Sequence, residues 1–195
     1  LDVDDDELIF FEKRLRAMER QGQLLINRKD VLCISEKLNL IPGKVMGHPD
    51  GFGFLIPDDK EVNDIFLSPR EMRQVFNNDR VMAQVTGIDR KGKSEGKIIE
   101  ILERVNKVLV GRVVQDQGVT IVAAEDKRIN QDIIIPDKSD MNAELGHVVE
   151  VEITTQPSFN SKPMGKIIKI LGDYSDSGIE IEIAVRKHSL PYEFS

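Results

Sequence analysis

The stretch of sequence that decides the fold is Asp50-Gly51-Phe52-Gly53-Phe54-Leu55, followed by Asp64-Ile65-Phe66-Leu67-Ser68. Side chains of an extended chain alternate between two faces, so Phe52 and Phe54 are predicted to point the same way. Phe66 joins that face from the next strand. Glycine alternating with large aromatic residues is typical of a small curved barrel whose outer face stacks nucleobases. The pattern is also compatible with phenylalanines that only fill a core.

The same pattern recurs one small domain later. At an offset of 68 residues, Gly43-Lys44-Val45 corresponds to Gly111-Arg112-Val113 and Asp64-Ile65-Phe66-Leu67 to Asp132-Ile133-Ile134-Ile135. At an offset of 69, Gly96-Lys97-Ile98-Ile99 corresponds to Gly165-Lys166-Ile167-Ile168. Offsets that agree to within one residue indicate an internal repeat, and the short β-rich runs of each copy predict a five-stranded OB-type barrel. Allowing a one-residue shift in the turn before the second strand, the residues of the second copy at the positions of Phe52, Phe54 and Phe66 are Val119, Ile121 and Ile134. We therefore expect the second barrel to lack stacking rings and to bind RNA weakly.

A helix and a hairpin are predicted before the first barrel. The apolar residues at helical spacing are Leu8, Phe11, Leu15 and Met18. Gly22 is expected to end this helix, and the apolar runs 24–26 and 31–34 flank a polar, basic tip that contains Arg28 and Lys29. A helix followed by a basic-tipped hairpin is typical of the back half of a winged helix, a fold often used on nucleic acid. With one full helix in the pattern, a truncated and partly disordered arm is the alternative interpretation.

The fold class predicted is mainly β, with two tandem OB-type barrels after the helix and hairpin. The expected domains are a partial winged-helix element over 1–40, OB domains over 41–105 and 106–172, and a linker with the start of a further domain over 173–195.

Three segments outside the barrel strands carry their own predictions. Residues 69–76 lack strand alternation and predict a short helix. The loop 155–163 contains Pro and Ser and is either mobile surface or a contact arm. Residues 179–186 alternate like a strand, which we expect to be unpartnered at the entrance to another domain.

Composition limits the class of protein. A length of 195 residues with 40% hydrophobic content is enough for two small cores. The acidic first residues lack the pattern of a signal peptide and the apolar runs are short, so a cytoplasmic protein is predicted. The single Cys33 cannot form an internal disulfide, and the three scattered histidines do not have zinc-site spacing. No carboxylate cluster has the spacing that two-metal hydrolysis requires, so no catalytic or metal site is expected in this chain.

The net charge of −7 argues against a generic basic nucleic-acid binder, because non-specific affinity comes from cations that neutralise phosphates. Locally the balance differs, since Arg90, Lys91 and Lys93 surround one turn. A binder that relies on stacking also needs fewer cations.

Four motifs in order resemble the amino-terminal region of the ribonuclease II family, and the resemblance covers nearly the whole chain. They are Arg14-Leu15-Arg16-Ala17-Met18-Glu19-Arg20-Gln21-Gly22-Gln23-Leu24, Gly47-His48-Pro49-Asp50-Gly51-Phe52-Gly53-Phe54-Leu55, Asp89-Arg90-Lys91-Gly92-Lys93 and Val185-Arg186-Lys187-His188-Ser189-Leu190-Pro191-Tyr192. The resemblance implies a winged-helix remnant, two cold-shock domains and the first residues of a catalytic domain. It also implies that the parent enzyme is a 3′ to 5′ exoribonuclease, a hydrolase that uses magnesium in its catalytic domain. Compared with free-standing cold-shock proteins, Met46 and His48 replace first-strand aromatics and Asp50 replaces the usual Lys.

The sequence therefore predicts a region that captures single-stranded RNA and guides its 3′ end to the catalytic site of the parent chain. The predicted RNA-binding residues are Phe52, Phe54, Phe66, His48, Lys44, Arg90, Lys91 and Lys93. The expected partners are single-stranded RNA and the rest of the parent enzyme, with no membrane, no cofactor in this region and a monomeric state. The alternatives are a stand-alone OB-fold RNA chaperone or translation factor, and a protein-interaction module that uses the barrel edges.

Overall fold

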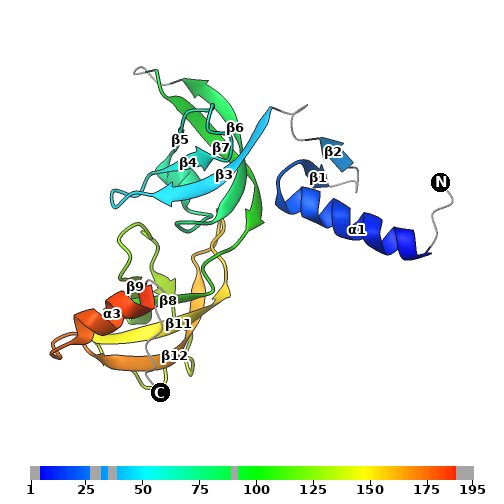
Figure 1. Cartoon of the computed structure of the whole chain (residues 1–195). Helices are drawn as coiled ribbons and strands as arrows, with labels where there is room; N and C mark the ends of the chain where they lie inside the picture. Colours follow the sequence, from blue (N-terminus) through cyan, green and yellow to red (C-terminus); the bar gives the residue numbers. More distant parts are fainter. Residues whose placement is uncertain (1–4, 27–31, 35–38, 89–91, 188–195) are drawn as a thin grey trace. The chain divides into compact units, whose positions relative to one another are not determined.

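The fold is taken from a computed structural model that describes residues 5–26, 32–34, 39–88 and 92–187 (Figure 1). Within these residues the strands form two closed five-stranded barrels and one two-stranded hairpin. The mainly β class with two OB-type barrels, a helix and a hairpin is therefore confirmed. No helix in the described ranges is both long and apolar enough to cross a membrane.

The first barrel has the strand order β3-β4-β5-β7-β6. Its strands are β3 (Leu40–Gly47), β4 (Gly53–Pro57), β5 (Ile65–Leu67), β6 (Arg80–Ile88) and β7 (Ser94–Glu103). Along β4 the burial alternates, with Leu55 inside and Phe54 partly exposed on the outer face. Leu55 and its neighbours Ile65 and Leu67 are fully buried. The core thus comes from the residues between the aromatic ones.

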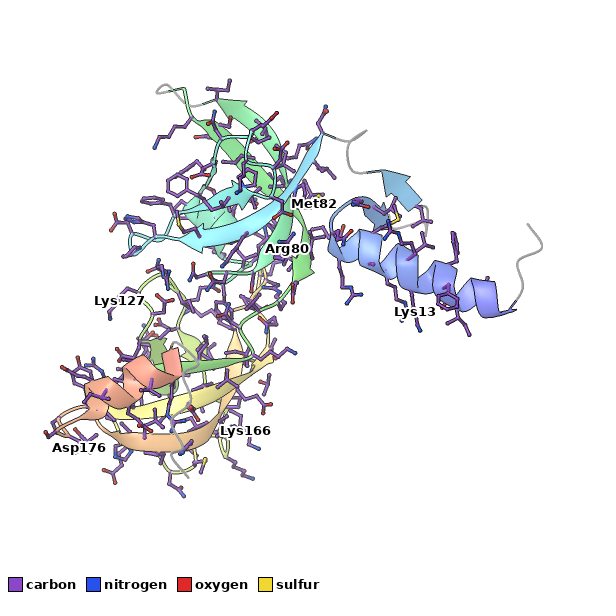
Figure 2. All side chains as sticks on the ribbon, viewed as in Figure 1. Lys13, Arg80, Met82, Lys127, Lys166 and Asp176 are labelled. Carbon is purple, nitrogen blue, oxygen red and sulfur yellow. The ribbon has the colours of Figure 1, made fainter. Side chains whose placement is uncertain are left out.

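The second barrel repeats this order as β8-β9-β10-β12-β11. Its strands are β8 (Val108–Asp116), β9 (Val119–Ala124), β10 (Ile133–Ile134), β11 (His147–Thr155) and β12 (Met164–Asp173). Its core is aliphatic and includes Val113, Val122, Ile133, Val149 and Ile167. From β12, Lys166 extends to an exposed position (Figure 2).

Within each barrel, one glycine of the first strand lies close to the backbone of the second strand, and this common feature confirms the repeat. A Cβ atom at Gly43 would lie 2.4 Å from the carbonyl oxygen of Ile56. At the corresponding Gly111 it would lie 2.5 Å from the carbonyl oxygen of Ala123. Only glycine fits at such distances, so both copies keep it at the same point of the first strand.

The compact units of the structure interleave along the chain. The first contains residues 1–46, 53–68 and 78–105, and the second contains the segments Gly47–Phe52 and Pro69–Asn77 together with residues 106–195. The second of these segments begins with the short helix α2 (Pro69–Met72), which confirms the helix predicted there. Phe76, 1% exposed, packs with Ala124 and Ile129 in one cluster of the second unit. The predicted domain boundaries stay a sequence prediction.

The amino-terminal helix and hairpin are present as predicted. Helix α1 spans Asp5–Arg20, and β1 (Leu24–Ile26) pairs antiparallel with β2 (Leu32–Ile34). The helix ends in a Schellman motif, in which the amide of Gly22 donates to Glu19 and the amide of Gln23 donates to Met18. Gly22 has φ of +73°, a value that suits glycine at this position. The basic hairpin tip lies outside the described residues.

The carboxyl-terminal segment is a helix, and the strand predicted there was wrong. Helix α3 spans Ile179–Lys187. The same pattern places Ile179 four residues before Ile183, and Glu182 four residues before Arg186. Residues four apart are neighbours on one face of a helix, so the pattern is equally compatible with a helix. Because the second barrel is closed, it offers no free edge with which another strand could pair.

Arg186 fixes α3 to the second barrel. Its side chain is only 4% exposed and forms ion pairs with Glu150 on β11 and, one helical turn back, with Glu182. Burial lowers the pKa of the Arg186 guanidinium, and the hydrogen bonds to Glu182 and Glu150 raise it by more. The helix therefore docks through a charged, largely buried contact.

Candidate nucleic-acid interface

Two aromatic rings lie opposite each other on the outer face of the first barrel. The antiparallel register of β4 and β5 pairs Phe54 with Phe66. Their ring centroids are 5.9 Å apart with an interplanar angle of 72°, an edge-to-face contact. Both side chains are partly exposed, whereas the next residues along the strands, Leu55 and Leu67, are buried. Alternation along both strands thus places two rings together on the outer face.

A cation lies over the Phe54 ring of this pair. The Nζ atom of Lys93 is 5.6 Å from the centroid of the Phe54 ring, within the range of a cation–π interaction. Phe54 and Lys93 line an open groove of about 590 Å³ in the first unit. The other lining residues are Met46, Lys60, Val62, Asn63, Asp64, Gly92 and Ser94. The groove combines an aromatic wall, two lysines and one acid, a composition that suits an anionic ligand with a flat ring.

A second stacked pair, His48 on Phe52, lies in the turn between β3 and β4. The ring centroids are 4.2 Å apart and the planes are inclined by 11°. The main chain closes the turn, because the His48 amide donates to the Phe52 carbonyl at 2.8 Å and the Gly51 amide donates to the His48 carbonyl at 3.0 Å. The Asp50 amide donates to Nδ1 of His48 at 3.2 Å, and the Asp50 carboxylate lies 3.5 Å from the same atom. With 45% of its side chain exposed, His48 can present a ring face and an N–H donor to a ligand.

Two asparagines that the sequence analysis missed hold this turn in the second unit. Asn130 donates from Nδ2 to the His48 carbonyl at 2.6 Å. Asn77, which is buried, accepts from the Gly47 amide at 3.1 Å. A Cβ atom at Gly47 would lie 2.2 Å from the Arg128 carbonyl oxygen, so the turn also packs tightly there. Because these partners are distant in sequence, no local pattern could have indicated them.

The remaining predicted residues are placed as follows. Lys44 is exposed on β3, where it pairs with Arg80 of β6, which Figure 2 labels. Arg90 and Lys91 lie outside the described residues. Phe52 belongs to the second unit, with His48. Its sharing of one face with Phe54 and Phe66 therefore stays a prediction.

The second barrel has the same strand register without the rings. Ile121 and Ile134 are paired across β9 and β10, as Phe54 and Phe66 are across β4 and β5. Ile121 is 8% exposed, and Val119, at the position that corresponds to Phe52, is exposed. The predicted loss of stacking rings at these positions is therefore confirmed.

No arrangement for metal chemistry is found among the described residues, where no group of three or more His, Cys, Asp or Glu side chains could hold an ion. One carboxyl group in the first unit has a shifted pKa. Burial raises the pKa of Glu100 on β7, and the negative charge of Glu19 on α1 raises it further. That shift concerns stability, because Glu100 does not line the groove beside Phe54.

Comparison with known proteins gives the family. A family model described as "Ribonuclease B OB domain" matches residues 43–101, and one described as "Cold shock domain" matches residues 121–195. Ribonuclease R of Acidithiobacillus ferrooxidans is 43% identical over 100% of this chain and 44% of that protein. The chain is homologous to the amino-terminal region of ribonuclease R. Ribonuclease R of Escherichia coli K12 is 40% identical over 96% of this chain and 23% of its own length. The chain thus spans less than half the length of these relatives.

Solved structures share the fold. Mycoplasma genitalium RNase R in complex with ribose methylated single-stranded RNA matches with a TM-score of 0.68 and 18% identity, over 80% of this chain and 25% of that one. Yeast Ssd1, described as a pseudonuclease, matches with a TM-score of 0.64 and 16% identity, over 80% of this chain and 26% of that one. The resemblance to the ribonuclease II family is confirmed, and the ribonuclease R relatives agree with an RNA-binding region of OB and cold-shock type.

Proposed function

We propose that this region binds single-stranded RNA on its aromatic residues and guides the 3′ end toward the exoribonuclease site of the parent enzyme. Phe54 and Phe66 stack bases, His48 and Phe52 supply a second stacking element, and Lys93 contacts phosphate. The other cations that the proposal assigns to phosphate are Lys44, Arg90 and Lys91. The hydrolytic step itself belongs to the remainder of the parent chain, where magnesium is expected.

The observation that supports this function best is the Phe54–Phe66 pair together with Lys93 over the Phe54 ring. Each base stacked on an aromatic ring contributes roughly 1 to 3 kcal/mol, and stacking tolerates any base because every base has a π-face. A duplex keeps its bases stacked on one another, so rings on an open face select single strands. This accounts for RNA binding by a chain whose net charge is −7.

The test is a titration of the whole chain with fluorescent oligo-uridine and with a matched RNA duplex. We expect preference for the single strand. Phe54→Ala should weaken binding by roughly 1 to 3 kcal/mol, because one stacking ring is removed. Phe54→Leu, which keeps apolar volume but removes the ring, should lose most of the same affinity.

The matched control is the substitution Val119→Ala. Val119 is exposed and lies at the position of the second barrel that corresponds to Phe52. The Val119→Ala variant should bind RNA with the affinity of the unmodified chain. Circular dichroism and a thermal scan would establish that each variant is folded. Unchanged affinity in a folded Phe54→Ala variant, or equal affinity for the duplex, would overturn the proposal.

A further inference from the structure

The loop between β11 and β12 carries an exposed aromatic ring on an ordered turn. Phe159 is 38% exposed at the tip of this loop. The loop base is fixed by two buried prolines, Pro157 and Pro163, and the carbonyl of Pro163 accepts from the amide of Ile134 at 2.9 Å. The sequence left open whether this loop is mobile surface or a contact arm, and these contacts favour the arm.

Hydrogen bonds between two serines close the tip. The amide of Ser158 donates to the carbonyl of Ser161 at 3.1 Å, and the amide of Ser161 donates to Oγ of Ser158 at 3.1 Å. The two hydroxyls are 2.6 Å apart. Phe159, between the two serines, is therefore held on a preformed turn. Because the loop is already ordered, binding a ligand would cost little conformational entropy.

A groove of about 350 Å³ lies beside this turn, and all of its lining residues belong to the second unit. They are Arg73, Asn130, Gln131, Asp132, Ser158, Phe159, Asn160, Ser161 and Lys162. Gln131 holds one wall by donating to the carbonyls of Met72 and Val75 at 2.9 and 2.8 Å. The volume is at the low end of the range for small-ligand pockets, about 300 to 1,000 Å³, which suits a ligand of roughly one nucleotide.

The charges of the groove favour an anion. Arg73 and Lys162 are exposed, and neither forms an ion pair within the described part of the chain, while Asp132 is the one acid among the lining residues. Asn160 adds an exposed amide that can both donate to and accept from a base edge. A positive groove on a chain of net charge −7 suits a phosphate.

The other rings described in the second unit are already engaged or buried. Phe76 is buried, the guanidinium of Arg112 lies 3.4 Å from the centroid of the Tyr174 ring, and Phe52 stacks on His48. The barrel face itself carries Val119 and isoleucines in place of rings. Phe159 is thus a further exposed ring of this unit, apart from the His48–Phe52 pair, and it lies on a loop instead of the barrel face.

We propose that this groove is a second nucleotide site, in which one base of single-stranded RNA stacks on Phe159 and the adjoining phosphate lies against Arg73 and Lys162. The inference rests on the proposed RNA-binding function and adds a contact that is separate from the Phe54–Phe66 pair. A single site of this kind agrees with weak binding by the second barrel. It also gives the loop between β11 and β12 a direct role in holding the strand.

Affinity measurements on the whole chain test the site with fluorescent oligo-uridine. Phe159→Ala and Phe159→Leu should each weaken binding about 5-fold or more, the lower end of what one stacked base provides. Leu145→Ala, which removes another exposed apolar side chain of the same unit, should bind normally. The double substitution Arg73→Gln and Lys162→Gln should make the slope of log affinity against log salt shallower by about 0.7 for each phosphate lost.

Photocrosslinking supplies a direct readout. Oligo-uridine that contains 4-thiouridine should crosslink to the peptide that carries Phe159, and this crosslink should persist in Phe54→Ala at saturating RNA. If Phe54→Ala weakens binding while Phe159→Ala does not, and no crosslink forms at this loop, the second site is wrong and the proposed function stands. If the unmodified chain does not bind the oligonucleotide at all, the proposed function fails as well.

Discussion

The side-chain amide of Asn130 donates a hydrogen bond of 2.6 Å to the main-chain carbonyl of His48. The same carbonyl also accepts from the amide of Gly51, so two donors fix the residue whose imidazole stacks on Phe52. Asn130 lies in the loop before β10, far from His48 in the sequence. A residue of the second repeat therefore orients a candidate stacking group in the turn before β4.

Replacing Asn130 by Ala should loosen the His48 turn. The imidazole protons of His48 lie against the Phe52 ring and should be shifted upfield by its ring current. In Asn130→Ala these resonances should move toward their random-coil positions, because one of the two donors to the His48 carbonyl is lost. Proton NMR of the whole chain measures this without RNA. The exposed neighbour Lys127, which Figure 2 labels, provides the control Lys127→Ala, and unchanged His48 shifts in Asn130→Ala would contradict the role.

Affinity measured at a series of salt concentrations should distinguish stacking contacts from phosphate contacts on the first barrel. Phe54→Ala should lower affinity and leave the slope of log affinity against log salt nearly unchanged, because a ring neutralises no phosphate. Lys93→Gln should make the slope shallower by about 0.7, the value for one phosphate on a single strand. Fluorescence titrations at several salt concentrations measure both quantities. A slope that does not respond to Lys93→Gln would place phosphate recognition elsewhere.

Glu100 should make the first unit less stable as the pH rises. Its pKa is raised from the usual 4.5 by burial and by Glu19, so the folded protein holds this proton more tightly than the unfolded chain does. Its favourable contribution is present below pH 4.5 and is lost as the pH rises through the raised pKa. Glu100→Gln should therefore stabilise the protein at neutral pH and flatten this part of the pH profile.

Urea unfolding of Glu100→Gln at a series of pH values checks this prediction. The exposed Glu103, at the end of the same strand, supplies the matched control Glu103→Gln. A profile for Glu100→Gln that parallels that of the unmodified chain would show that Glu100 carries no such penalty.

Arg186→Met should destabilise the docking of α3. The substitution keeps an apolar stem but leaves Glu150 and Glu182 without their shared partner. Hydrogen bonds to charged groups contribute about 1.5 to 3 kcal/mol, so a loss in this range is expected in the unfolding free energy. The unfolding free energy of Arg186→Lys should lie between those of Arg186→Met and the unmodified chain, because one ammonium group cannot reproduce the forked contacts to both carboxylates. Chemical denaturation of the three proteins gives the comparison, and equal stability of Arg186→Met and the unmodified chain would rule the contact out as a stabilising one.

The sequence predicted those features that depend on local periodicity. Phe54, Leu55 and Phe66 could be assigned to faces because strands alternate with a period of two, and the offset between Gly43 and Gly111 located the second barrel. The segment that became α3 could not be assigned in this way, because Ile and Glu in alternation also satisfy the four-residue spacing of a helix.

Features that depend on contacts between distant segments could not be predicted. Asn77 and Asn130 hold the Gly47–Phe52 turn through side-chain amides, and nothing near them in the sequence indicates that role. The order of the Phe159 loop depends on hydrogen bonds between Ser158 and Ser161. A loop composed of Pro, Ser and Asn is otherwise equally compatible with a mobile segment.

The interleaving of the two compact units has a consequence for biosynthesis. The segment Pro69–Asn77 leaves the ribosome well before Ala124 and Ile129, the residues against which Phe76 packs. Until they emerge, Phe76 has no apolar cover from that cluster, and the nascent chain offers an aromatic side chain to chaperones or to other chains. The segment Pro69–Asn77 is therefore expected to complete its packing against this cluster only after the second repeat has been translated as far as Ile129.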